Sequence, residues 1–243
     1  LIPAKAPEWQ RVLELATALS KRSHDLRVLL LLARAATRLR GGEGLAYVLG
    51  VTEGLLREKW STVHPQTIVD GVDDPHVRYG VLCEFAAPDG LVADLRQATG
   101  LQSALGVLSV RDLERLVEQG AVEVNGISIT RSQVDEMVRD MLLLNQNPSQ
   151  WVDSVLKSLG GMQEILEKRL GGELVPDWSA LRRPLERARG VLQGESGRQL
   201  IGSGMPPSAI TEGPGHQVAG AAMPWLDSIA SRADVIKAMD AIC

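Results

Sequence analysis

Residues 9–64 read WQRVLELATALSKRSHDLRVLLLLARAATRLRGGEGLAYVLGVTEGLLREKWSTVH. Apolar residues recur at three- and four-residue intervals over 7–19 and 43–63, which predicts two amphipathic helices. The segment 26–39 between them is apolar on nearly every side, which is typical of a helix surrounded by partners. Ser23 is a good N-cap for this helix, and Asp25 lies favourably near its positive end. Gly41-Gly42 then ends the helix. So short a connection predicts that the second and third helices pack antiparallel.

The rest of the chain continues the helical pattern. Hydrophobic residues make up 44% of the sequence but aromatic residues only 3%, so the core must be aliphatic. Leu, Ala, Arg and Glu are also good helix formers. The predicted fold is mainly α, a multi-helix bundle of antiparallel amphipathic helices. Further helices are expected at 75–85, 89–99 and 109–120, and from residues 130, 147 and 177 onwards, the last ending near 192. Asp74 and Asn147 are predicted as caps, Asp177 as the start of the last helix, and Ser109-x-x-Asp112 and Thr130-x-x-Gln133 as capping boxes.

One segment reads differently. Residues 122–129 alternate between apolar and polar types on both sides of Asn125-Gly126. Asn-Gly readily adopts the positive φ angles of a tight turn, so the segment predicts one small β-hairpin. Because a hairpin this short is marginal alone, we expect it to lean on the helices.

The composition also divides the chain. Residues 1–192 are expected to form one helical N-terminal region, with a subdivision near residue 105 left open. Residues 193–223 are rich in Gly, Pro and Ser, which predicts a flexible linker. Residues 224–243 resume an apolar pattern and are expected to begin a further, truncated region. The chain begins without Met, so we expect a piece of a longer protein.

Charge and cysteine content narrow the function classes. With 26 basic and 30 acidic side chains, the net charge of −4 offers no general attraction for nucleic acid. The longest purely apolar run, 28–33, is far shorter than the roughly 20 residues that span a bilayer. Cys83 and Cys243 form no metal-ligand pair, so the simplest expectation is a reduced, cytoplasmic setting.

The segment after the third helix contains histidine and aspartate residues that could bind a metal ion. Its candidate ligands are His64, Asp70, Asp73, Asp74 and His76. Calcium loops need regularly alternating oxygen ligands that end in Glu, and this spacing fails after Asp74. We therefore favour a polar loop that caps the next helix, and expect no metal.

Two short motifs near the second helix contain residue types that are found in catalytic or nucleotide-binding sites. Ser23-His24-Asp25 holds the residue types of a nucleophilic triad, but neighbours on one helical turn do not converge as a triad requires. Capping explains Ser23 and Asp25 more simply. Gly41-Gly42-x-Gly44 follows no strand, whereas phosphate-binding glycine loops need a strand-turn-helix setting. We expect no catalytic residue and no cofactor.

Arg27, Arg34 and Arg38 fall close to one line along the second helix. This stripe is a candidate binding face for an acidic partner, and the alternative is a solvated or internally ion-paired stripe. Three tryptophans at helical positions are interpreted as core anchors rather than stacking platforms. They are Trp60, Trp151 and Trp178.

The order and spacing of several residues resemble the ImpA-type N-terminal domain of the TssA family of bacterial type VI secretion systems. These residues are Trp9, Asp25-Leu26-Arg27, Gly41, Gly44, Trp60, His64-Pro65 and Arg78. The resemblance continues at 109–114 and 176–178, covers about 7–192 and resumes near 224. Three features depart from the family pattern: the usual stretch before Trp9 is essentially absent, the C-terminal part is cut at Cys243, and Ser23-His24-Asp25 replaces a more common Lys-Asp pairing.

The resemblance implies a noncatalytic assembly or scaffold protein that recruits or positions baseplate, spike, inner-tube and sheath proteins. It implies a cytoplasmic homo-oligomer, assembled through the missing C-terminal part, on a machine docked at the inner membrane, without nucleic acid or direct membrane insertion. A related sheath-capping or membrane-anchoring protein is one alternative. A small helical hydrolase using His24, His64 or His76 is the other.

Overall fold

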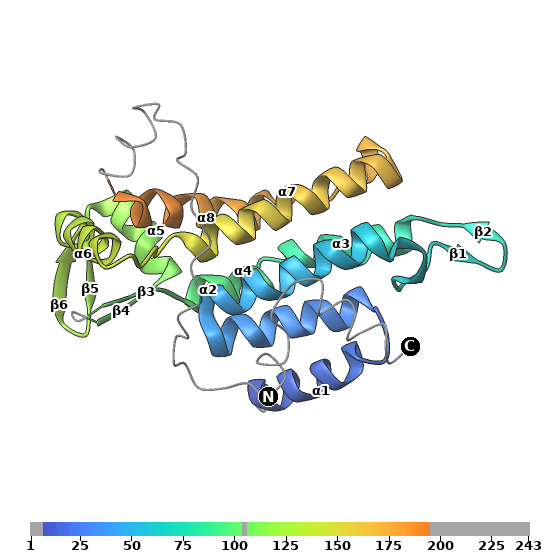
Figure 1. The fold of residues 1–243 in the computed structure, drawn as a ribbon, viewed down its shortest axis with the longest axis horizontal. Helices are drawn as coiled ribbons and strands as arrows, with labels where there is room; N and C mark the ends of the chain where they lie inside the picture. Colours follow the sequence, from blue (N-terminus) through green and yellow to red (C-terminus); the bar gives the residue numbers. More distant parts are fainter. Residues whose placement is uncertain (1–6, 104–105, 195–243) are drawn as a thin grey trace, which may run out of the picture.

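The computed structural model describes residues 7–103 and 106–194, and it confirms a mainly α fold with small antiparallel hairpins (Figure 1). The described α-helices are α1 (Trp9–Ser20), α2 (Leu26–Glu58), α3 (His76–Cys83), α4 (Leu91–Gln97), α5 (Val110–Gln119), α6 (Arg131–Leu143), α7 (Gln150–Leu170) and α8 (Ser179–Leu192). Short 3-10 turns cover Trp60–Thr62, Glu84–Ala86 and Gly172–Leu174. The strands are β1 (Ile68–Val69), β2 (Val72–Asp73), β3 (Thr99–Ser103), β4 (Gly106–Ser109), β5 (Ala121–Val124) and β6 (Ile127–Thr130).

The helix α2 is sharply broken at Gly41, where φ is 64° and ψ is −149°. Its two halves fold back on each other, so the start of α2 meets the segment after its end. The Leu26 amide donates to the His64 carbonyl at 2.9 Å, and the His64 amide donates to the His24 carbonyl at 2.8 Å. The predicted antiparallel pair is therefore confirmed. Both α1 and α7 pack against α2 (Figure 1).

The core is aliphatic, as the composition predicts. Its centre is formed by fully buried leucines of α2, including Leu26, Leu45 and Leu49. The prediction that the first half of α2 is surrounded on all sides is wrong at two positions, because Leu31 and Leu39 are exposed. The stripe predicted for α1 also fails at its end, where Leu19 is 49% exposed and Ser20 is buried instead.

Local capping signals are confirmed at the starts of α5 and α6. Ser109 and Asp112 form one reciprocal capping box, and Thr130 and Gln133 form the other. Each box satisfies amides that the first turn of a helix leaves without intrahelical partners.

The hairpin predicted at 122–129 is present as β5 and β6. Its turn residues Asn125 and Gly126 have φ angles of 52° and 79°. The hairpin packs against α5 and α6 and buries Val122 and Ile129, so it does lean on the helices.

Two further hairpins were missed. The segment 99–109, interpreted as a helix end and a connection, forms the β3–β4 pair. The acidic loop after residue 65 contains the small β1–β2 pair. Asp74 and Asn147, predicted as caps, and Asp177, predicted to begin the last helix, each lie just before the observed N-caps, which are Pro75, Ser149 and Trp178. Each of the three side chains accepts a hydrogen bond from the backbone amide two residues further on.

The described part of the chain ends at Gly194, so nearly all of the predicted linker at 193–223 and the region 224–243 lie outside it. The subdivision near residue 105 stays a prediction. Among the described helices, none combines the length and apolar character needed to cross a bilayer.

We expect Gly41→Ala to lower the free energy of unfolding by about 1–3 kcal/mol, because side chains disfavour this backbone conformation. An added Cβ would also lie 3.1 Å from the Thr99 carbonyl oxygen. Gly80→Ala in α3 is the control, since that position is open and helical, and it should stabilise by up to about 1 kcal/mol. Urea unfolding would measure both, and equal effects would contradict the assignment of the break to Gly41.

Candidate functional site

Asp94 of α4 forms ion pairs with two arginines of α2, Arg34 and Arg38. Its carboxylate is fully buried and accepts hydrogen bonds from Arg34 Nε at 2.7 Å and Arg38 Nε at 2.6 Å. Arg38 also binds the Gln97 side chain. The Trp9 ring of α1 lies 5.4 Å from each guanidinium centre, within cation-π range. Three helices therefore meet at one carboxylate.

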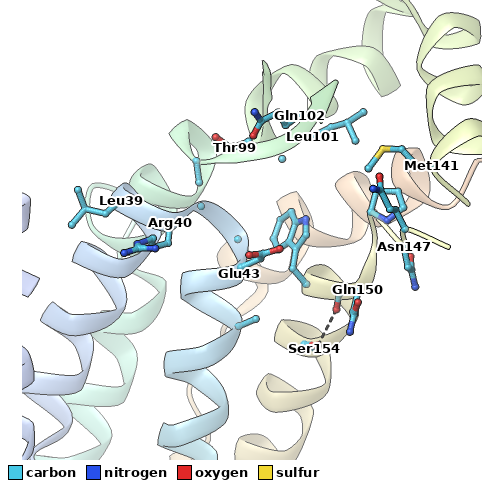
Figure 2. A pocket seen from close by; sticks show the side chains of 18 of the residues that line it. Leu39, Arg40, Glu43, Thr99, Leu101, Gln102, Met141, Asn147, Gln150 and Ser154 are labelled. Carbon is cyan, nitrogen blue, oxygen red and sulfur yellow. Dashed lines mark hydrogen bonds between the residues drawn. The ribbon is translucent and has the colours of Figure 1, made fainter. Parts of the chain in front are cut away.

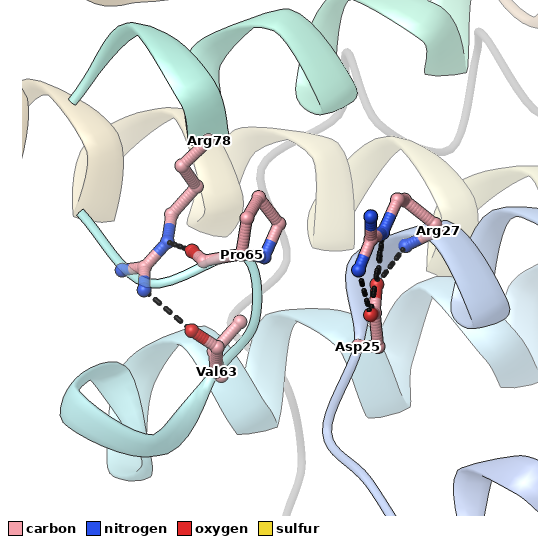
Figure 3. Close-up of polar contacts among 5 residues, drawn as sticks. All are labelled: Asp25, Arg27, Val63, Pro65 and Arg78. Carbon is pink, nitrogen blue, oxygen red and sulfur yellow. Dashed lines mark hydrogen bonds and ion pairs between the residues drawn. The ribbon is translucent and has the colours of Figure 1, made fainter. Parts of the chain in front are cut away.

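Arg27 lies on the same stripe but pairs with another carboxylate. Asp25 caps α2 by accepting from the Arg27 amide at 2.9 Å, and it also accepts from Arg27 Nε and Nη2 at 3.0 and 2.6 Å (Figure 3). Hydrogen bonds from the Arg27 side chain lower the pKa of Asp25, although desolvation opposes them. Arg27, Arg34 and Arg38 thus adopt the internally ion-paired arrangement that the sequence left as an alternative. Their role in partner binding stays a prediction.

Arg78 organises the segment that follows α2. Its side chain is 1% exposed and donates to the carbonyls of Pro65 at 3.0 Å and Val63 at 2.5 Å (Figure 3). It also donates to the Trp60 carbonyl at 3.3 Å. The guanidinium also lies 4.3 Å from the centre of the Trp60 ring. Burial lowers the pKa of Arg78, and the nearby Asp73 carboxylate partly opposes this shift. The structure therefore brings Trp60, His64-Pro65 and Arg78 into one structural cluster.

The remaining candidates are the possible metal ligands, the Ser23-His24-Asp25 motif and the glycine motif that ends at Gly44. Within 7–103 and 106–194, no group of three or more His, Cys, Asp or Glu side chains could hold a metal ion. His24 Nδ1 lies 3.3 Å from the Thr62 hydroxyl, while the neighbouring Asp25 carboxylate binds Arg27, so these groups do not converge as a triad. A Cβ on Gly44 would lie 2.4 Å from the Ala36 carbonyl oxygen, so glycine permits the close approach of the two halves of α2.

The tryptophans divide into different environments. Trp178 is a core anchor, 3% exposed, and its indole N–H donates to the Leu82 carbonyl at 2.9 Å. Trp60 is half-buried against the core, and the guanidinium groups of Arg78 and Arg169 lie 4.3 and 5.7 Å from the centre of its ring. Trp151 is half-buried at the start of α7 and lines a groove.

The sequence interpretation missed this groove, which has a volume of about 910 Å³. It lies where the break in α2, the strand β3 and the start of α7 meet, and we call it the kink groove (Figure 2). A Cβ on Gly42 would lie 2.1 Å from the Trp151 ring, so glycine lets the indole lie directly against the break. In the sequence, the kink groove is indicated by the pair Gly41-Gly42.

Figure 2 shows how the kink groove is lined. Thr99 and Gln102 of β3 lie on one side of it, and Arg40 and Glu43 lie at the break in α2. Asn147 lies on the opposite side, just before α7. The lining combines apolar, amide and charged groups.

Comparison with known proteins gives three findings. The family model described as "ImpA, N-terminal, type VI secretion system" matches residues 2–86. The chain is 40% identical over 87 residues to the type VI secretion system component TssA1 of Pseudomonas aeruginosa PAO1, an alignment that covers 36% of this chain. It spans only 25% of that relative.

The third finding concerns the fold. The structure is similar to the N-terminal domain, including the conserved ImpA_N region, of the TssA component of the type VI secretion system from Burkholderia cenocepacia. The TM-score is 0.58 at 22% identity, and the match covers 80% of each chain. The family model and the TssA1 relative confirm the resemblance over residues 2–86, and the structural match shows a similar fold.

We expect Asp94→Asn to lower the free energy of unfolding by about 1.5–3 kcal/mol, because two guanidinium groups would lose their charged acceptor. The control is Glu14→Gln, which breaks an ion pair whose side chains are 64% and 52% exposed. It should cost about 0.5 kcal/mol or less. Urea unfolding of both variants is the measurement, and an Asp94→Asn effect as small as the control would contradict the role given to this carboxylate.

A second prediction concerns pH. Asn caps a helix as well as Asp does, so Asp25→Asn removes the charge and retains the cap. Because the folded state lowers the pKa of Asp25 below its ordinary 3.8, the charge stabilises the fold above that pH and its contribution is lost as the pH falls further. The stability difference between wild type and Asp25→Asn should therefore shrink in acid. Denaturant unfolding over a pH series tests this, and a pH-independent difference would contradict it.

Proposed function

We propose, from the premise that this chain carries the ImpA N-terminal region of the TssA family, that it is a noncatalytic scaffold of a type VI secretion system. It would recruit or position baseplate, spike, inner-tube and sheath proteins while the tail is assembled. The observation that carries this proposal is the match of residues 2–86, with 40% identity to a TssA1 component.

The chemistry of the described residues supports binding rather than turnover. The groups that could act as acid, base or nucleophile near the start of α2 are used in capping and packing, as His24 and Asp25 show. The kink groove offers a surface suited to a polypeptide.

The oligomeric part of the proposal concerns sequence beyond the described residues. We propose that the chain belongs to a cytoplasmic homo-oligomer, held together by a C-terminal part, on a machine docked at the inner membrane. Several copies of a weak binding surface would then gain affinity through effective concentration.

The test is affinity capture with residues 1–243 as bait, from a lysate that contains all tail and baseplate proteins, read by mass spectrometry. We expect enrichment of at least one tube, spike, sheath or baseplate protein over a lysate that lacks the secretion genes. Arg27→Glu tests the predicted face, since its side chain is 66% exposed, and Arg183→Glu on α8 is the matched control. Reversing an exposed charge should weaken capture about two- to fivefold if Arg27 contacts the partner. A folded bait that captures none of these proteins would contradict the scaffold function.

A further inference from the structure

The strand β3 leaves one edge open along the kink groove. Among the described strands it pairs only with β4, in a two-stranded antiparallel sheet. Four consecutive residues, 99–102, line the groove. The β3–β4 register is interrupted by a bulge between Thr99 and Leu101 and is regular from Leu101 to Ser103. Within that regular part every second residue directs its N–H and C=O away from β4. An edge of this kind is a template for another extended chain.

The walls of the kink groove complement the two faces of such a chain. The half-buried Trp151 indole and Met141 provide apolar surface for alternate side chains. The exposed amide groups of Gln102, Asn147 and Gln150 provide donors and acceptors at the rim. Main-chain bonds to an edge strand, with pockets for alternate side chains, are a known mode of peptide recognition.

The charges at the mouth of the kink groove indicate which kind of peptide segment it would bind. Arg34 and Arg38 share the single carboxylate of Asp94, which leaves one positive charge unbalanced. Arg40 adds an exposed cation at the rim, and Glu43 is the acidic residue of the lining. The mouth of the groove is therefore positive by one charge on a chain whose net charge is −4. This local excess favours an acidic ligand.

We propose that the kink groove binds an extended, acidic segment of a partner protein, which adds as a strand to the open edge of β3. An apolar residue of the segment packs against Trp151, and a carboxylate approaches Arg40. The expectation that this partner is a tail or baseplate protein rests on the proposed function. The binding mode rests on the groove alone.

The probe is a phage-displayed library of random peptides about ten residues long, enough to cover a strand and its flanks. Selection on the full chain should enrich peptides rich in Asp and Glu. For the selected peptides, Arg40→Glu should weaken binding about three- to tenfold, whereas Arg183→Glu on α8 should leave it unchanged. Both positions are exposed, and circular dichroism would confirm that both variants fold.

Hydrogen exchange supplies the readout specific to strand addition. A bound peptide should slow amide exchange within 99–103, since an added strand accepts bonds from the open edge. The proposal is overturned if no peptide is enriched, if Arg40→Glu binds like wild type, or if 99–103 gains no protection.

The two proposals fail differently. Capture of tail proteins together with failure of the peptide or exchange tests would reject the groove and leave the scaffold function standing. Acidic peptides that bind the groove, with no tail protein captured, would leave the groove standing and reject the scaffold function.

Discussion

The buried carboxylate of Asp94 is the constraint on which the arrangement of the N-terminal helices depends. An ionised carboxylate without solvent is costly unless it is paired and hydrogen-bonded, and Arg34 and Arg38 satisfy both needs. Because those two residues lie one turn apart on α2, their bonds fix α4 against one face of that helix. Trp9 lies over the same guanidinium groups, so α1 is held at the same point. Arg38 also lines the kink groove, so the packing of three helices fixes one of its walls.

Arg78 supplies the second constraint, at the opposite end of the α2 hairpin. The segment after α2 is irregular, so several of its carbonyl groups need hydrogen-bond donors from outside a helix or sheet. The Arg78 guanidinium supplies these donors. Its N–H groups reach three carbonyls while its face lies over Trp60. The segment so fixed presents His64, whose backbone pairs with that of His24 and with the first turn of α2. The hairpin is thus closed by glycine at one end and by Arg78 at the other.

Local signals were readable from the sequence and non-local ones were not. Capping boxes and the Asn125-Gly126 turn depend on neighbours in the chain, and they were predicted correctly. The β1–β2 hairpin carries a comparable signal in Asp70-Gly71, with φ angles of 52° and 81°, which the charge of that segment obscured. The sequence of the β3–β4 segment contains no Asn-Gly or Asp-Gly pair. The arginine stripe was found, but its partner Asp94 lies 56 and 60 residues beyond Arg38 and Arg34, so spacing could not reveal the ion pairs.

The internal use of these arginines limits how a partner can be bound. Two of the three candidate cations are only 28–29% exposed and already bonded to Asp94, so a partner gains little from them directly. What remains is one unbalanced charge and the exposed Arg40, and a solvated ion pair contributes about 0.2–1 kcal/mol. In the binding mode that we propose, a single copy of the groove would give selectivity for acidic segments but weak affinity. Useful affinity would then require several copies acting together, because linkage raises effective concentration without any new contact. The proposed homo-oligomer would supply those copies.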